Sequence, residues 1–101
     1  MNINVHSILF DADQKLVGFI QEKLEKLTVY HDRIQAAEVF LRLEHDSENR
    51  ENKVVEIRMT IPGHELFAKR QGKTFEEAAV EVVEALRSQS GRTKERLNKA
   101  S

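Results

Sequence analysis

The chain has 101 residues, 40% apolar and 33% charged, with no cysteine, one proline and a formal net charge of −1 from 16 basic and 17 acidic side chains. A chain of this length predicts a single domain, residues 1–101, which buries enough surface to fold without a metal ion, a disulfide or another cofactor. The composition excludes disulfide frameworks, thiolate zinc sites, a membrane span of roughly 20 apolar residues and a bulk attraction to nucleic acid, so we expect a cytoplasmic protein with no membrane partner.

The first predicted elements are a strand and a helix. Residues Asn2 to Ser7 alternate between apolar and polar side chains, which indicates a strand. A helix follows and extends to about Val29; it begins at Asp11 or Asp13, because either carboxylate can accept hydrogen bonds from the first exposed amides. Its apolar side chains recur at three- and four-residue steps, so one face packs on a flat surface; they are Leu16, Val17, Ile20, Leu24 and Leu27.

Three further strands are predicted. Residues 37–44 and 55–61 alternate and are joined by a polar hairpin loop over 45–52, Pro62-Gly63 indicates a turn, and 65–70 alternate again. One face of this sheet is therefore buried and the other is in water. Phe40 and Phe67 fall on the wet face, where they stack nucleic-acid bases or contact a partner protein, unless they touch each other across strands or a strand is shifted by one residue.

The second helix begins at Thr74, because Thr74-Phe75-Glu76-Glu77 forms a capping box in which the threonine oxygen accepts from the Glu77 amide. Its apolar stripe lapses after Leu86, so we expect the helix to extend beyond the sheet, either continuing through Gly91 or kinked or ended there. The stripe consists of Phe75, Ala78, Ala79, Val82, Val83 and Leu86. The order β-α-β-β-β-α predicts an α+β two-layer sandwich with both helices on one face of a four-stranded sheet.

Basic residues are the leading candidates for a binding site. On the first helix Lys23 and Lys26 lie beside the apolar stripe, on the flank of Phe19, with Glu22 and Glu25 turned further away. Residues 87–101 carry a net charge of +4, with five basic side chains, Arg87, Arg92, Lys94, Arg96 and Lys99, against one glutamate.

These two basic sets have two interpretations. Arg92, Arg96 and Lys99 share one arc if the helix continues through Gly91, and with the first-helix lysines they would form a positive groove that grips RNA by its phosphates. The alternative is a solvated surface whose charges suit the helix dipole. Lys69 and Arg70, at the end of the fourth strand, either extend the positive patch or protect an edge strand.

No residues with catalytic or metal-binding spacing accompany these cations. The histidines, His6, His31, His45 and His64, stand far apart and none has a partner at ligand spacing on one helix. No nucleophile has its usual local context, and the paired glutamates belong to solvent-facing helix arcs. We expect no metal site and no enzymatic activity.

Three features together give a family resemblance: the strand order, Lys23-Leu24-Glu25-Lys26-Leu27 followed by Tyr30-His31-Asp32-Arg33-Ile34, and Phe75-Glu76-Glu77-Ala78 with Leu86, Gln89, Arg92, Lys94, Glu95 and Arg96. In these the chain resembles a short-form ribosome hibernation promoting factor, of the family also called ribosome-associated inhibitor or sigma modulation protein. The likeness spans nearly the whole chain.

The resemblance implies a fold similar to a double-stranded-RNA-binding domain and a monomer that binds ribosomal RNA of the small ribosomal subunit. Bound between head and body, such proteins block messenger and transfer RNA and regulate translation in slow growth or stress. The matching RNA-facing positions are Lys23, Lys26, Arg92, Lys94 and Arg96. Arg33 either contacts phosphate or pairs with Asp32, and Arg87 and Lys99 complete the predicted set. The alternative is a protein-interaction domain of this fold that has lost RNA binding.

Overall fold

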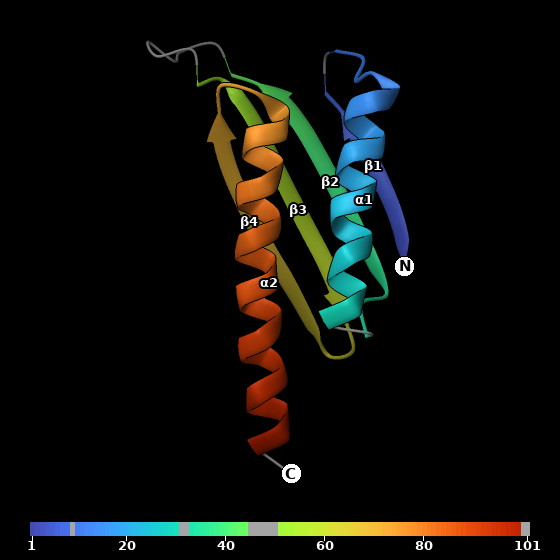
Figure 1. The fold of residues 1–101 in the computed structure, drawn as a ribbon, viewed down its shortest axis with the longest axis vertical. Helices are drawn as coiled ribbons and strands as arrows, with labels where there is room; N and C mark the ends of the chain where they lie inside the picture. Colours follow the sequence, from blue (N-terminus) through green and yellow to red (C-terminus); the bar gives the residue numbers. More distant parts are fainter. Residues whose placement is uncertain (9, 31–32, 45–50, 100–101) are drawn as a thin grey trace.

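The computed structural model describes residues 1–8, 10–30, 33–44 and 51–99, and the side chains in these ranges except those of 29–30 and 92–99. The element order is β1 (Asn2–Ser7), α1 (Gln14–Tyr30), β2 (Ala36–Leu43), β3 (Lys53–Ile61), β4 (His64–Gly72) and α2 (Phe75–Lys99). The strands form one sheet in the order β1-β2-β3-β4, and both helices lie on the same face of it (Figure 1). This confirms the predicted two-layer β-α-β-β-β-α architecture.

The sheet is mixed. Strand β1 pairs in parallel with β2, and α1 is the crossover that a parallel pair requires. The β2–β3 and β3–β4 pairs are antiparallel. Strand β3 begins at Lys53, two residues before the predicted start at Val55. The prediction relied on alternating burial, and Val54 and Val55 are neighbours that are both fully buried, so the alternation did not reveal the first two residues of the strand.

The hydrophobic core lies between the sheet and the helices. Its largest fully buried side chains come from both layers and include Ile20, Leu24, Leu41, Ile57, Met59, Val82 and Leu86. Fully burying one such side chain is worth roughly 1.5–3 kcal/mol relative to exposing it. The apolar stripes predicted for the helices are the buried ones, apart from Val17 and Phe75, which are partly buried.

Side-chain caps fix the first turns of both helices. The Leu16 amide donates to Asp13 Oδ1 at 2.7 Å, so Asp13 rather than Asp11 is the cap of α1. The Glu77 amide donates to Thr74 Oγ1 at 3.0 Å, which confirms the predicted cap of α2.

Helix α2 continues through Gly91 to Lys99, so of the alternatives left open by the sequence the structure excludes a helix that ends at Gly91. A glycine costs a helix only about 1 kcal/mol relative to alanine, too little to stop a long helix without a proline or a glycine turn. Ser90, just before it, is 3% exposed and its Oγ has no partner among the described residues, so the buried face outlasts the apolar stripe. Figure 1 shows the last turns of α2 extending past the sheet, as predicted.

The outer edge of β4 is covered by side chains. Gln89 of α2 donates from Nε2 to the Phe67 carbonyl at 2.9 Å, and its Oε1 accepts from the Phe67 amide at 3.4 Å. Arg70 donates to the Lys69 carbonyl at 2.8 Å. These contacts occupy backbone groups that would otherwise be open to another strand. For Arg70 they support the edge-protecting role over an extension of the positive patch.

Replacing Gly91 by alanine should stabilise the domain. An added Cβ meets no atom within 4 Å, and α2 is helical on both sides, so Gly91→Ala should raise the free energy of unfolding by roughly 0.5–1 kcal/mol. Thermal unfolding followed by circular dichroism measures the change. Gly63→Ala is the control, because Gly63 has a φ of 76° in the β3–β4 turn and an alanine there should lower the stability. If both variants changed the melting temperature in the same direction, Gly91 would not be an ordinary helical position.

Gln89→Leu should lower stability. The leucine cannot bond to the Phe67 backbone, and losing two partly exposed hydrogen bonds costs roughly 1–2 kcal/mol. Urea unfolding measures the loss, and Ser88→Leu, at the neighbouring exposed position, is the matched control. Equal stability of the two variants would show that the Gln89 bonds contribute nothing.

Candidate nucleic-acid interface

The predicted RNA-binding residues belong to segments that meet at one end of the molecule. Helices α1 and α2 run in the same direction across the sheet, so their C-terminal halves lie at the same end (Figure 1). Lys23 and Lys26 occupy that half of α1, and Arg33 follows the helix before β2. Arg87 lies at the middle of α2, and residues 92–99 occupy its C-terminal half.

Lys23 is held against the flank of α1. Its Nζ lies 5.5 Å from the centre of the Phe19 ring, a cation–π contact, and the side chain is partly buried. The contact confirms that Lys23 and Phe19 share a flank, and it orders the lysine stem.

Lys26 has a carboxylate neighbour on its own helix. Its Nζ lies 3.5 Å from Glu22 Oε1. Residues four apart on a helix are surface neighbours, which brings the two side chains together. Both are about two-thirds exposed, and a pair in that setting contributes only about 0.2–1 kcal/mol.

Arg87 is paired in the same way. Its guanidinium lies 2.6 Å from Glu84 Oε2, with both side chains about half exposed. Arg33 is exposed between α1 and β2, whereas its predicted alternative partner, Asp32, lies outside the described residues, as does His31.

The side chains of Arg92, Lys94, Arg96 and Lys99 also lie outside what the structure describes. Their backbone is helical, since α2 extends to Lys99. The condition for positions 92, 96 and 99 to follow one another on one arc of a helix is therefore met.

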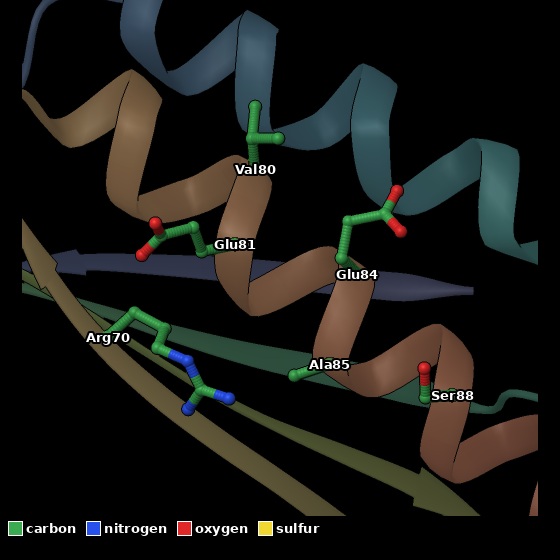
Figure 2. Close-up of a pocket in the computed structure, with 6 residues that line it drawn as sticks. All are labelled: Arg70, Val80, Glu81, Glu84, Ala85 and Ser88. Atoms are coloured by element: carbon green, nitrogen blue, oxygen red, sulfur yellow. The ribbon is translucent and has the colours of Figure 1, made fainter.

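The first half of α2 carries the opposite charge. Residues 75–86 include four glutamates and no basic residue. An open groove between this half and β4 receives Arg70 from the strand and two carboxylates from the helix (Figure 2); its lining is Arg70, Val80, Glu81, Glu84, Ala85 and Ser88. Two carboxylates against one guanidinium make this groove unsuited to a phosphate backbone.

Acidic side chains on the open face of the sheet lie beside basic or imidazole groups. Arg42 lies 3.1 Å from Glu56, and His6 lies 2.6 Å from Glu38. The hydrogen bond from His6, followed by that from Asn4, holds the pKa of Glu38 below its ordinary value of 4.5. Paired charges of both signs do not make a basic platform for RNA.

Phe40 and Phe67 lie on this open face, so the strand register is as predicted. They do not touch each other, because β3 lies between their strands. Phe40 stacks on His6 with ring centres 5.0 Å apart, and Arg58 lies 5.8 Å from the centre of the Phe67 ring. Phe67 remains 44% exposed, which leaves it as the more accessible aromatic of the two.

Within the described residues, no three His, Cys, Asp or Glu side chains are grouped so that they could hold a metal ion. In the part of the chain that the structure describes, neither helix combines the length and apolar character needed to cross a membrane. His45 lies outside the described ranges.

Comparisons with known proteins agree with the fold. The model of the sigma 54 modulation protein / S30EA ribosomal protein family matches residues 3–98. The structure is similar to a ribosomal subunit interface protein from Coxiella burnetii, with a TM-score of 0.82 and 18% identity over 93% of this chain and 98% of the other. It is also similar to the N-terminal domain of Protein Y from Thermus thermophilus, with a TM-score of 0.78 and 22% identity over 92% and 99%. A comparison with curated protein sequences gives no match.

The Glu38 contacts predict a pH dependence of stability. The pKa of Glu38 is lower in the folded than in the unfolded protein, where it is about 4.5. The ionised carboxylate therefore stabilises the fold at pH values above the pKa of the unfolded state, and this stabilisation is lost as the pH falls through the pKa of the folded state. Glu38→Gln should therefore differ most from the parent at neutral pH and approach it under acid conditions. Chemical unfolding at several pH values measures this; a difference that does not change with pH would contradict it. Glu65→Gln, which removes a carboxylate from β4, is the matched control.

Proposed function

Because the chain belongs to the sigma 54 modulation protein / S30EA ribosomal protein family, we propose that it is a ribosome hibernation factor that binds ribosomal RNA of the small subunit. The family comprises ribosome-associated factors and is not a known enzyme family. One copy occupies the decoding region between head and body, blocks messenger and transfer RNA, and inhibits translation. It acts in the cytoplasm during slow growth or stress.

The observation that carries this proposal is the common end at which the basic segments meet. The C-terminal halves of α1 and α2 lie there, and the last turns of α2 extend past the sheet (Figure 1). A helix that extends past its own core can enter a groove between RNA elements without a clash from the sheet. Basic residues on such a helix contact phosphates, which position a protein on folded RNA.

The ion pairs at this end do not oppose RNA binding. Glu22 and Glu84 neutralise Lys26 and Arg87 in the free protein, but both pairs are exposed and therefore weak. An RNA phosphate can replace either carboxylate as the partner, and the flexible glutamate then turns to solvent. The pairs therefore reduce the affinity by little.

The overall charge of −1 is compatible with this function because the charges are segregated. Four glutamates lie in residues 75–86, and five of the 16 basic residues lie in 87–101. At physiological salt the Debye length is about 8 Å, so charges on the distant half of α2 are largely screened from a phosphate at the basic end. Binding then depends on local rather than net charge.

The proposal predicts that Arg92→Glu combined with Arg96→Glu weakens binding to small subunits at least roughly tenfold, or about 1.4 kcal/mol, without unfolding the domain. Loss of two phosphate contacts should also reduce the salt slope of binding by about two. Cosedimentation with purified small subunits at two salt concentrations measures both quantities, and in vitro translation measures inhibition.

The matched control is Lys15→Glu combined with Lys73→Glu. It makes the same change in net charge at the opposite ends of the two helices, where acidic residues suit the helix N-termini. We expect near-parental binding from this control. If the Arg92/Arg96 variant inhibits translation as well as the parent, the RNA-binding assignment is wrong. Binding that is insensitive to salt and abolished by Phe67→Ala would instead support a protein-interaction domain.

A further inference from the structure

Strand β1 forms the second edge of the sheet, and half of its backbone groups point outward. The Asn2 amide donates to the Gln35 carbonyl at 3.1 Å, and the Ile8 amide donates to the Leu41 carbonyl at 3.0 Å. The backbone amides and carbonyls of the even-numbered residues therefore point toward β2. Backbone groups alternate sides along a strand, so those of Ile3, Val5 and Ser7 point away from the sheet. Within the described chain these groups have no hydrogen-bond partner.

The β1 edge lacks the protection seen at β4. Residues 2–7 contain no Lys, Arg, Asp, Glu or Pro, the residues that usually discourage strand pairing at an edge. At β4, by contrast, Gln89 and Arg70 occupy outward backbone groups. Ile3 and Val5 are only partly buried, and Ile8, directly after β1, is 38% exposed. The edge therefore combines free backbone groups with incompletely covered apolar side chains.

Side chains on the open face of the sheet hold β1 in an ordered extended conformation. Asn4 Nδ2 donates to Glu38 Oε1 at 3.0 Å, His6 Nε2 lies 2.6 Å from Glu38 Oε2, and the His6 ring stacks on Phe40. A strand that is already ordered loses little conformational entropy when another strand pairs with it.

We propose that β1 pairs with β1 of a second copy of this chain, antiparallel and about a two-fold axis. With Val5 opposite Val5 of the partner subunit, Ile3 lies opposite Ser7 of the partner subunit, so every outward-pointing residue meets another. The two sheets then form one continuous sheet of eight strands with all helices on one face. Such an interface is isologous and closes at two copies.

The charge of the strand favours a second copy over a charged peptide. Residues 2–7 contain no Lys, Arg, Asp or Glu, and His6 already contacts Glu38 of its own chain, so two copies bring no unpaired like charges together. A charged peptide would place unpaired charges beside the apolar Ile3 and Val5. One strand pair buries less area than a stable dimer needs, so the association is weak and appears at high protein concentration.

The inference concerns the free protein and does not rest on the proposed function. Strand β1 and the strand beside α2, β4, are the two opposite edges of the sheet, so pairing leaves the basic end of α2 uncovered. Binding of one copy to a small subunit is a separate property, measured with ribosomes present.

Sedimentation velocity of the full chain, without ribosomes, tests the inference from micromolar to near-millimolar concentration. We expect the mean mass to rise with concentration from 11.7 kDa toward twice that value. Hydrogen exchange should show the Ile3, Val5 and Ser7 amides becoming protected over the same range. Those of β4 should not change.

Two variant pairs test the contact itself. Ser7→Pro removes one outward amide from each copy and should raise the dimer dissociation constant roughly tenfold, whereas Ser7→Ala keeps the amide and should associate like the parent. Asn4→Lys places lysines near the two-fold axis and should weaken pairing. Thr60→Lys adds the same charge to the same face on an interior strand and should not.

The inference is overturned if the parent keeps the mass of one copy at every concentration. It is also overturned if Ser7→Pro and Asn4→Lys, folded by circular dichroism, associate as strongly as their controls. Binding of an extended peptide at β1 by a protein that does not self-associate would likewise count against a second copy as the occupant.

Discussion

Burial of apolar side chains on a single face of the sheet is the constraint on which the structure depends. The apolar stripes of α1 and α2 pack on one face of the sheet, because only that face is apolar. The other face of the sheet carries charged side chains such as the pair Arg42 and Glu56. Alternation along β2, β3 and β4 puts the complementary apolar set on the helical side. Losing this burial would expose a core that provides most of the stabilising free energy, since hydrophobic burial is the main favourable term in folding.

The same constraint brings the basic segments together. Strands β1 and β2 are parallel, so α1 must return along the sheet, and α2 begins after β4 at the end of the sheet where α1 also begins. The two helices consequently run in one direction, with Asp13 and Thr74 capping them at the same end. Their C-terminal halves share the other end, where α2 extends past the sheet (Figure 1). Residues distant in sequence, such as Lys26 and Arg87, thus belong to one end of the fold.

Local patterns in the sequence were sufficient to predict the architecture and most element boundaries. Alternation, helical periodicity and the Thr74 cap are short-range signals, and the one-sided core follows from them. Features that depend on neighbours in space were not predictable: the Gln89 contact with the Phe67 backbone joins two elements, and the lapse of the apolar stripe gave no sign that Ser90 is buried. The Lys26–Glu22 pair was within reach of the i, i+4 rule, but the residues were sorted by their distance from the apolar stripe rather than by their neighbours on the helix surface. The helix through Gly91 shows that a propensity cost near 1 kcal/mol does not decide a boundary by itself.

The separation of acidic and basic residues along α2 determines from which side a polyanion such as RNA would approach the fold. The four glutamates of residues 75–86 lie on the part of the helix that covers the sheet, so they repel phosphates from the side of the molecule. Apart from Arg87, the basic residues of α2 follow Ser90 and lie toward the part that continues past the sheet. A helix with uniform basic charge would attract RNA along its whole length and in several orientations. With the signs separated, electrostatic complementarity selects an approach to the end of α2, and specificity of orientation follows without any increase in net charge.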